Sequence, residues 1–433
     1  MNFNKCTPTD GYSKALDLPS GWVVNPVKEL AVLNEKNLKR NSSCHFIEYI
    51  DIDSVEEGII KKTKSLPITK APSRAKRIVK NKDILISSVR PNLKHYCRIR
   101  EAKLCTIAST GFIVLTPNEI DPDFLYYSIT TERYTNYLSG IAETSTTAYP
   151  SITSEVIAES FIHCPPLEEQ HSISKILSDL DSKIELNQQM NKTLEAMAQT
   201  LFKHWFIDFE FPDESGQPYK SSGGEMVDSE IDKIPIGWSV NQVKDLGQIV
   251  CGKTPSTKIS DHFGEDYPFI KIPDMRGLLF TEKTETKLSK KGSNLILNKK
   301  LPPMSVCVSC IATPGLVTLT SIESYTNQQI NSIICKDTVS PYYVYFQMKA
   351  KRNEILAKGS SGTATLNLNT GDFSNIWVLI PSQNVMENFH RLVQPMLSKV
   401  TRKKFSMSDS EIVLGIYSSI GILILPDISL GRI

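Results

Sequence analysis

The sequence predicts an α+β fold in which one mixed α/β unit is used twice, with a long helix between the two copies. The first observation is a repeat: "LPSGWVVNPVKEL" returns as "IPIGWSVNQVKDL", and the tryptophans within it, Trp22 and Trp238, lie 216 residues apart. The second is that short apolar runs typical of strands alternate with helical segments in each copy. The third is a heptad pattern of apolar residues over about 168–206.

The repeat continues along both halves of the chain at nearly the same offset. "DPDFLYYSI" corresponds to "SPYYVYFQM", "PSITSEVI" to "LNLNTGDF", and "PPLEEQHSISKILSDLDSKI" to "PSQNVMENFHRLVQPMLSKV". Self-similarity at a fixed offset indicates one structural unit used more than once. We therefore expect, in order, a first mixed unit, a long helix, a linker, a second mixed unit and a second helix, with the ranges 1–165, 166–211, 212–233, 234–382 and 383–433.

Within each unit, the pattern of apolar residues predicts individual elements. Strands are expected over 83–89 ("DILISSV"), 111–116 ("GFIVLT") and 331–335 ("NSIIC"), which are short, apolar and rich in β-branched residues. Amphipathic helices are expected over 122–138 ("PDFLYYSITTERYTNYL") and 342–356 ("YYVYFQMKAKRNEIL"). Each unit therefore contains both a sheet and helices.

The long helix is expected to pair with a second helix. At about 39 residues it would extend roughly 58 Å, which is longer than a compact domain needs. Two asparagines lie on its apolar stripe, where they would weaken packing and fix the register or the partner. The residues expected at the helix-pairing seam are Ile173, Leu177, Leu180, Ile184, Asn187, Asn191, Leu194, Ala198 and Leu201. A polar, turn-rich linker, "PDESGQPYKSSGG", follows this helix.

The stretch "GQIVCGKT", residues 247–254, fits the phosphate-loop pattern G-x-x-x-x-G-K-[ST]. A working phosphate loop needs a helix directly after its lysine, so that backbone N–H groups converge on the phosphates. Here Pro255 follows Thr254, which disfavours a helical conformation at Thr254, and the residues after it show no helical period. We interpret the match as chance and keep a nucleotide hydrolase using Lys253 and Thr254 as the enzyme alternative.

Composition places the chain among ordinary soluble proteins of two or three domains. It has 433 residues, a net charge of +2, 40% hydrophobic and 22% charged residues. The N-terminus lacks the apolar core of a signal peptide. Nine cysteines without a spacing framework indicate a reducing compartment and free thiols. Cys307 and Cys310 lie on a strand-like segment, where side chains three apart point to opposite faces, so we expect buried structural cysteines and no metal site.

The small net charge conceals two basic regions and an acidic one. Residues 61–103 contain 14 Lys or Arg and 2 acidic residues, and residues 235–383 contain 16 and 11. Residues 168–214, which include the long helix, contain 10 acidic residues and 4 lysines. Basic and amide side chains suit contacts to phosphates and to base edges, so both units are expected to bind DNA. Arg90, Lys94, His95, Tyr96 and Arg98 are candidates in the first unit.

In the second unit, "NQQINS" places the amides of Gln328 and Gln329 beside two asparagines. Such amides can form paired hydrogen bonds with adenine. The chain shows no Asn-Pro-Pro-[Tyr/Phe] methylase motif, no glycine-rich loop for S-adenosylmethionine and no nuclease carboxylate cluster with a following lysine. We therefore expect a binding protein without catalytic equipment of its own.

Several of these segments resemble one known family. "PPLEEQHSISKILSDLDSKIELNQQMNKTLEAMAQTLFKHWFIDFEF" resembles the central conserved region of specificity subunits of type I restriction–modification systems, and the repeated "GW" segment resembles the start of each target recognition domain. "GKTPST", "FIKIPDMRG" and "GSSGTATLNL" are similar to later loops of that domain. The resemblance covers about residues 1–400.

The resemblance implies two target recognition domains joined by long antiparallel coiled-coil-like helices, each domain reading half of a bipartite, asymmetric double-stranded DNA site. It implies a cytoplasmic protein that docks two DNA-adenine methyltransferase subunits and, through the complex, restriction subunits, with no membrane. It implies no cofactor on this chain, with S-adenosylmethionine, ATP and Mg²⁺ on the partners. The expected DNA-binding residues are Lys61, Lys62, Arg74, Lys76, Arg77, Arg90, Lys94, Tyr96, Arg98, Lys253, Thr254, Ser256, Lys258, Lys271, Arg276, Gln328, Gln329, Ser360, Ser361 and Thr363.

The end of the chain departs from the family pattern. The family has a long second helix, whereas here the helical pattern fades after Val400 and an apolar, β-branched run with two glycines follows over 412–425. Fourteen residues are too few to span a bilayer. We hypothesise that the tail is altered, as a frameshift in the gene would do, which would weaken helix pairing. A scaffold that has lost full assembly through this tail is therefore the third alternative.

Overall fold

The computed structural model describes residues 19–39, 44–144, 150–360 and 366–400. It divides within the long helix, after Ile184, into two units that are described separately below. The altered tail hypothesised after Val400 lies outside the described residues.

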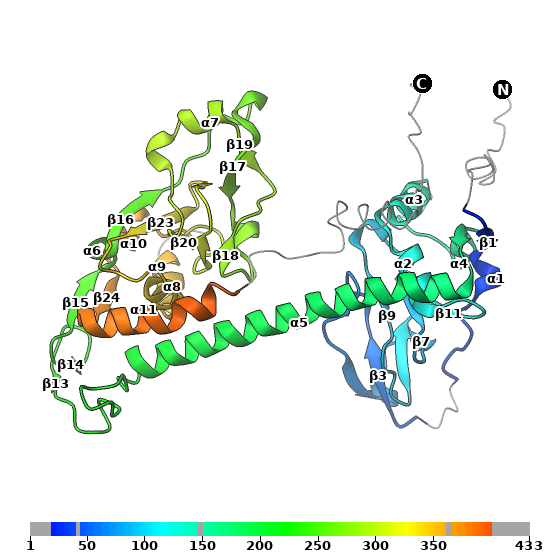
Figure 1. The fold of residues 1–433 in the computed structure, drawn as a ribbon, viewed down its shortest axis with the longest axis horizontal. Helices are drawn as coiled ribbons and strands as arrows, with labels where there is room; N and C mark the ends of the chain where they lie inside the picture. The colour runs from blue at the N-terminus through cyan, green and yellow to red at the C-terminus, as the bar shows by residue number, and fades with distance from the viewer. Residues whose placement is uncertain (1–18, 40–43, 145–149, 361–365, 401–433) are drawn as a thin grey trace. The chain divides into compact units, whose positions relative to one another are not determined.

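Unit 1 contains two four-stranded sheets (Figure 1). The order in the first is β2-β11-β8-β9 and in the second β6-β3-β10-β7. Two helices, α2 (Pro122–Ile129) and α3 (Glu132–Glu143), pack against the first sheet and bury its apolar side chains. The strand bounds are β2 Ala31–Leu33, β3 Phe46–Ile50, β6 Lys64–Pro67, β7 Ala75–Ile78, β8 Ile84–Ser87, β9 Tyr96–Arg98, β10 Thr106–Ser109 and β11 Phe112–Pro117, with a small hairpin of β4 Val55–Glu56 and β5 Ile59–Ile60.

The helices of unit 1 show why one prediction was wrong. The single helix expected over 122–138 is divided into α2 Pro122–Ile129 and α3 Glu132–Glu143. The side chain of Thr131 accepts a hydrogen bond from the backbone N–H of Tyr134 and thereby caps a new helix. The remaining helices of the unit are short: α1 Val27–Leu30 and α4 Ser154–Ala158.

Unit 2 is built on a five-stranded sheet in the order β16-β23-β20-β21-β18, with a three-stranded sheet β19-β17-β22 (Figure 1). Its strands are β16 Gly247–Cys251, β17 Phe263–Ile270, β18 Phe280–Thr281, β19 Lys287–Leu288, β20 Val306–Ser309, β21 Val317–Thr320, β22 Tyr325–Thr326 and β23 Ile330–Cys335, with a hairpin of β13 Met226–Val227 and β14 Ile234–Pro235. Its helices are α6 Val243–Leu246, α7 Lys290–Asn294, α8 Pro341–Ala350, α9 Arg352–Gly359, α10 Thr370–Ser374 and α11 Gln383–Leu397. The helix expected over 342–356 is thus also divided in two, as α8 and α9.

The repeat predicted from the sequence is confirmed down to strand register. In unit 1, β1 (Val23–Pro26) pairs antiparallel with β12 (Phe161–Cys164), and Val23 is opposite Cys164. In unit 2, β15 (Ser239–Gln242) pairs with β24 (Trp377–Ile380), and Ser239 is opposite Ile380. Both residues of the second pair lie 216 positions after those of the first. The strands expected over 83–89, 111–116 and 331–335 are present as β8, β11 and β23.

The long helix α5 spans Leu167–Phe206, 40 residues, as the heptad pattern predicted. Its first turns belong to the core of unit 1 through Ile173 and Leu177. Its last turns belong to the core of unit 2, where Phe206 contacts the rings of Tyr343 at 4.7 Å and Phe389 at 4.9 Å. Figure 1 shows α11 alongside this last part of α5 and running in the opposite direction.

The expected helix-pairing seam is therefore divided among three environments. Leu194 and Leu201 pack against the core of unit 2, as Ile173 and Leu177 do in unit 1. Ile184, Asn187 and Asn191 are half-buried, and Leu180 is 37% exposed. Because α11 ends at Leu397, it pairs with the last turns of α5 over a shorter length than the heptad pattern suggested.

The polar stretch after α5 is folded onto unit 2. The ring of Phe211 stacks on Tyr219 at 4.6 Å and on Trp238 at 5.0 Å. The backbone N–H groups of Ser215 and Gln217 donate to the carboxylate of Asp213. This segment is an ordered turn that closes one side of the unit 2 core.

Candidate nucleic-acid interface

In unit 2, four segments far apart in the sequence meet beside the five-stranded sheet. We call residues 252–256, 310–313, 327–329 and 366–369 the unit 2 loop cluster. The N–H of Cys310 donates to the carbonyl of Gln329 at 2.8 Å, and the N–H of Leu368 donates to the carbonyl of Cys310 at 2.8 Å. The N–H of Lys253 donates to the carbonyl of Thr326 at 3.0 Å. Backbone hydrogen bonds thus join these segments into one surface.

Half of the residues in this cluster carry an amide or a hydroxyl. The hydroxyl of Thr254 donates to Oε1 of Gln328 at 2.7 Å, and Nδ2 of Asn327 donates to Oε1 of Gln329 at 2.8 Å. Gln328 is exposed and Gln329 half-buried. Because each amide is held by a neighbour, its remaining donors and acceptors are oriented before any ligand arrives. Such groups can form hydrogen bonds with base edges.

The geometry of residues 247–254 contradicts a phosphate loop. Gln248–Cys251 is part of strand β16. No helix follows Lys253 directly, as the sequence predicted, and the next helical turn is Ser260–His262. Thr254 is hydrogen-bonded to Gln328 instead of facing a nucleotide. A nucleotide hydrolase built on Lys253 and Thr254 is therefore not supported.

Unit 1 contains an equivalent arrangement, which we call the unit 1 loop cluster, residues 88–91, 109–111 and 150–152. The N–H of Ser88 donates to the carbonyl of Gly111 at 2.8 Å, and the N–H of Ile152 donates to the carbonyl of Ser88 at 2.8 Å. The bonds made by Cys310 in unit 2 have the same pattern. The two clusters therefore share a backbone framework and differ in their side chains.

The unit 1 cluster carries positive charge. Arg90 is exposed, and the carbonyl of exposed Arg74 accepts a hydrogen bond from the N–H of Thr110 at 2.8 Å. Two guanidinium-bearing residues thus lie on or beside this surface. Guanidinium groups bind both phosphates and the guanine edge.

Four of the basic or aromatic candidates of unit 1 already contact other residues of the unit. Lys94 forms an ion pair with Glu132 at 2.7 Å, and Lys61, whose side chain is exposed, pairs with Glu56 on the surface. The side chain of Arg98 is only 10% exposed, pairs with Asp123 and lies 5.4 Å from the ring of Tyr126. Tyr96 is half-buried, and burial raises the pKa of its hydroxyl well above the ordinary value. Arg98 and Tyr96 hold strand β9 to α2, so they are poorly placed for DNA contact.

The other predicted DNA-binding residues divide by exposure. The half-buried ones include Arg77, which donates to Oδ1 of Asn37 at 3.1 Å, and Lys271, whose Nζ donates to the hydroxyl of Thr286 at 2.7 Å. Ser361 and Thr363 lie outside the described residues. The exposed ones are Lys62, Arg74, Lys76, Arg90, Lys253, Ser256, Lys258, Arg276, Gln328 and Ser360.

Several polar residues of the clusters were missed by sequence reasoning. They are Thr110 and Ser151 in unit 1 and Thr313, Asn367 and Asn369 in unit 2. The available signal was the repeat, because "PSITSEVI" and "LNLNTGDF" align Ser151 with Asn367. The match indicates a repeat, but by itself it does not indicate a binding site.

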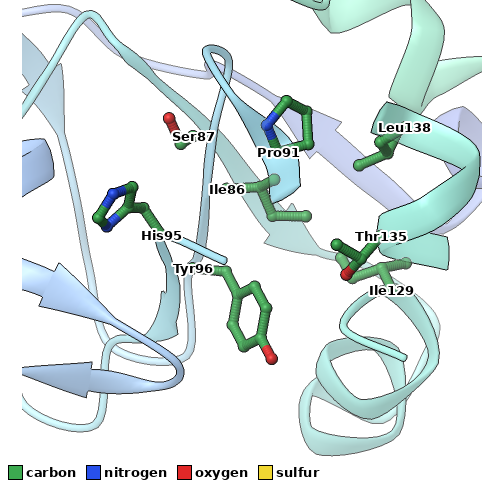
Figure 2. Close-up of a pocket in the computed structure, with 8 residues that line it drawn as sticks. All are labelled: Ile86, Ser87, Pro91, His95, Tyr96, Ile129, Thr135 and Leu138. Carbon is green, nitrogen blue, oxygen red and sulfur yellow. The ribbon is translucent and has the colours of Figure 1, made fainter. Parts of the chain in front are cut away.

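A small, mostly apolar pocket lies beneath the turn at residues 88–95 in unit 1. Figure 2 shows Pro91 at its rim, beside Ile86 of β8 and facing Leu138 of α3. Tyr96 and Thr135 complete much of the lining. Pro91 is part of this lining, and the turn that it begins, Pro91–Leu93, packs against α3.

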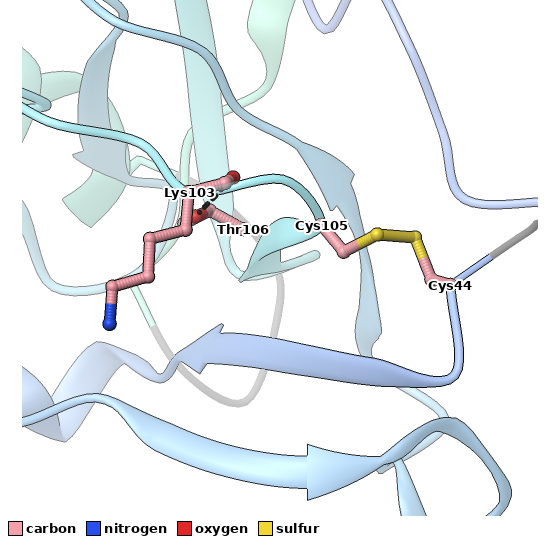
Figure 3. The surroundings of a disulfide bond; sticks show 4 residues. All are labelled: Cys44, Lys103, Cys105 and Thr106. Atoms are coloured by element: carbon pink, nitrogen blue, oxygen red, sulfur yellow. Dashed lines mark hydrogen bonds between the residues drawn. A yellow bond between two sulfur atoms is a disulfide. The ribbon is translucent and has the colours of Figure 1, made fainter.

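The cysteines correct one prediction. Cys44 and Cys105 form a disulfide with a Cα–Cα distance of 6.0 Å, so the expectation that all cysteines are free thiols was wrong (Figure 3). They lie 61 residues apart, and the parallel pairing of β3 with β10 brings them together. Cys307 and Cys310 are buried free thiols, as expected. Burial raises the pKa of the Cys310 thiol to about 11 and that of Cys307 to about 12.

Across the described ranges, no group of three or more His, Cys, Asp or Glu side chains is arranged to hold a metal ion. None of the helices in those same ranges is both long and apolar enough to cross a membrane.

Comparisons with known proteins agree with the repeated architecture. The family described as "Type I restriction modification DNA specificity domain" matches residues 19–196 and 235–391, one match for each copy of the repeat. The Type I restriction enzyme HindI specificity subunit of Haemophilus influenzae is 37% identical over 382 residues, which cover 76% of this chain and 83% of that protein. The MjaIX specificity subunit of Methanocaldococcus jannaschii is 27% identical over 373 residues, covering 82% and 78%.

A solved structure shares the fold. The type I restriction–modification system S subunit from M. genitalium aligns over 96% of this chain and 99% of that chain, with a TM-score of 0.57 and 12% identity. At this identity the alignment establishes similar architecture alone.

Proposed function

This chain belongs to the type I restriction–modification DNA specificity family, and from that premise we propose that each of its units reads one half of a bipartite, asymmetric DNA site. Within that family the chain is the non-catalytic, DNA-binding specificity subunit, whose partners are DNA and the methyltransferase and restriction subunits. The observation that carries the proposal is the loop cluster built twice on one backbone framework. Because its side chains differ between the units, the two half-sites should differ in sequence.

The two clusters suit different parts of DNA recognition. In unit 2, the amides of Gln328 and Gln329 are oriented by Thr254 and Asn327, which favours contact with base edges. In unit 1, exposed Arg74 and Arg90 supply the charge that phosphate contacts and guanine recognition require. Phosphate contacts fix the position of the protein, and the base contacts determine sequence.

We assign the spacing of the two half-sites to α5. Its 40 residues correspond to a length of about 60 Å, and half-sites on one face of DNA lie about 34–36 Å or a multiple apart. Midway along the helix, Leu186 and Met190 are 59% and 46% exposed, although they are large and apolar. We propose that the methyltransferase subunits, two in number, dock along this helix.

The remaining parts of the proposal concern chemistry and location. This chain holds no cofactor of its own; S-adenosylmethionine, ATP and Mg²⁺ belong to the partner subunits. The complex acts in the cytoplasm, on double-stranded DNA.

The experiment is co-expression with the methyltransferase subunit of the same system in a host free of DNA methylation, followed by base-resolution methylation sequencing. A bipartite methylated motif supports the proposal. Absence of methylation from a complex that still co-purifies would instead favour a scaffold that has lost DNA reading. If the proteins do not co-purify, the hypothesis of an altered tail after Val400 gains support, and circular dichroism of a 400–433 peptide mixed with the long helix tests it: strong helix formation would refute it.

A further inference from the structure

Two residues at equivalent places in the units have an unusual backbone conformation. Arg90 in unit 1 has φ of 48°, and Ala312 in unit 2 has φ of 63°. Both lie in the left-handed region, which is unfavourable for any residue with a Cβ and easy for glycine. The surrounding sequences, "SVRPN" and "CIATP", do not themselves indicate the equivalence.

The equivalence comes from hydrogen bonding. The N–H of Arg90 donates to the carbonyl of Pro150 at 2.9 Å, and the N–H of Ala312 donates to the carbonyl of Leu366 at 2.9 Å. The two acceptors lie 216 residues apart, which is the offset of the repeat. The residue before each also forms a bridge to the same strand-like segment, Val89 with Ser151 and Ile311 with Asn367. The same turn has therefore been built twice.

The framework of the turn is held from several sides. In unit 1, the turn Pro91–Leu93 packs against α3 (Figure 2), and Lys94, itself left-handed, is paired with Glu132. Backbone strain persists only where the surroundings over-determine it, and it clusters at functional sites. Both copies keep a residue with a side chain where glycine would fit more easily, but the side chains differ completely in size and charge.

We propose that positions 90 and 312 are matched base-reading positions, one in each half-site, with a fixed backbone and an exchanged side chain. This inference rests on the proposed function. Each turn is joined by a backbone hydrogen bond to the neighbouring segment of its cluster, because the N–H of Ser88 donates to the carbonyl of Gly111 and the N–H of Cys310 donates to the carbonyl of Gln329. Arg90 presents a guanidinium, which reads O6 and N7 of guanine in the major groove. Ala312 presents an exposed methyl group, which suits the 5-methyl group of thymine.

Arg90→Gly tests the proposal, because it removes the guanidinium while relieving the backbone. The full-length subunit is co-expressed with its methyltransferase and the methylated motif is sequenced. We expect one guanine position of one half-site to relax, with discrimination falling about 5- to 150-fold, the range for loss of a bidentate base contact. The other half-site should be unchanged, and the melting temperature should not fall below that of the wild type.

A matched control is Lys82→Gly. Lys82 is also basic, exposed and left-handed, with φ of 74°, and it lies in unit 1 outside the loop cluster. Its variant should methylate the wild-type motif. An unchanged motif for Arg90→Gly, or an equal loss of methylation at every sequence with normal folding, would overturn the inference while leaving the proposed function intact. A wild-type complex that methylates no bipartite motif would overturn the proposed function, and this inference with it.

Discussion

Substitution of Gly252 by alanine should disrupt DNA recognition by unit 2. We expect this effect to come from packing of the loop cluster and not from loss of nucleotide binding at the phosphate-loop-like segment. A Cβ at this position would lie 2.2 Å from the backbone oxygen of Asn327 and 2.4 Å from that of Thr326. These two oxygens belong to the backbone, so rotation of the Thr326 side chain, whose hydroxyl would also lie 2.4 Å away, does not relieve the overlap. The segment 252–254 must therefore move away from the 326–329 turn, which separates Thr254 from Gln328.

The size of the effect follows from this overlap. Comfortable carbon–oxygen contacts are about 3.3–3.6 Å, so the backbone must shift by roughly 1 Å. Overpacking of this kind typically costs about 1–3 kcal/mol. For a unit of this size such a loss lowers the melting temperature by roughly 2–12 °C.

The assay combines thermal unfolding with methylation sequencing of the co-expressed complex. We expect Gly252→Ala to lower the melting temperature and to relax the half-site read by unit 2, while the other half-site is kept. The control is Gly140→Ala in helix α3, where the new Cβ meets nothing within 4 Å and should stabilise the helix by up to about 1 kcal/mol. Two results would refute the reasoning: an unperturbed half-site with unchanged stability, or nucleotide binding that depends on Lys253.

Three further predictions concern stability. Phe206→Ala removes a ring that is 2% exposed and should cost about 3–5 kcal/mol in urea unfolding, whereas Ile207→Ala, at a side chain 50% exposed, should change little; equal effects would contradict the packing described. Reduction of the Cys44–Cys105 disulfide opens a loop of 61 residues and should lower stability by about 4 kcal/mol in the chain-entropy estimate, measured by thermal unfolding with and without reductant; two additional free thiols in the unreduced protein would rule this out. Burial lowers the pKa of His390 below its usual 6.5, so the unfolded chain takes up a proton first as the pH falls. The contribution of neutral His390 to the free energy of unfolding is therefore present above about pH 6.5 and is lost as the pH falls below that value. His390→Gln should flatten the dependence of the unfolding free energy on pH between about 5 and 7.

The parts of the fold that the sequence predicted depend on local or repeated signals. The long helix was visible because its heptad pattern continues through every turn, and the repeated strands were visible because Trp22 and Trp238 mark the same place in each unit. The break between α2 and α3 was missed because the apolar pattern continues across it, and only the capping role of Thr131 ends one helix and begins the next.

The candidate site was harder to predict because it depends on contacts between distant segments. Basic residues can be counted in a sequence, but the count does not show that Arg98 lies over Tyr126 and pairs with Asp123. Likewise, no spacing rule joins Cys44 to Cys105, which approach each other only through sheet pairing. The left-handed backbone at Arg90 follows from bonds to a segment 60 residues later, so propensity at that position gave no indication of it.

The repeated mixed α/β region of each unit begins and ends on the two strands of a single ladder, β1 with β12 and β15 with β24. The ends of this region are thus hydrogen-bonded neighbours, and everything between them forms a closed insertion. Recombination with crossovers inside these two strands would exchange one such region for a homologous one. The topology of the rest of the chain would not change, because the ladder registers are the same in both copies. New specificities could then arise by shuffling whole regions of this kind between genes, in addition to point mutation within the loops.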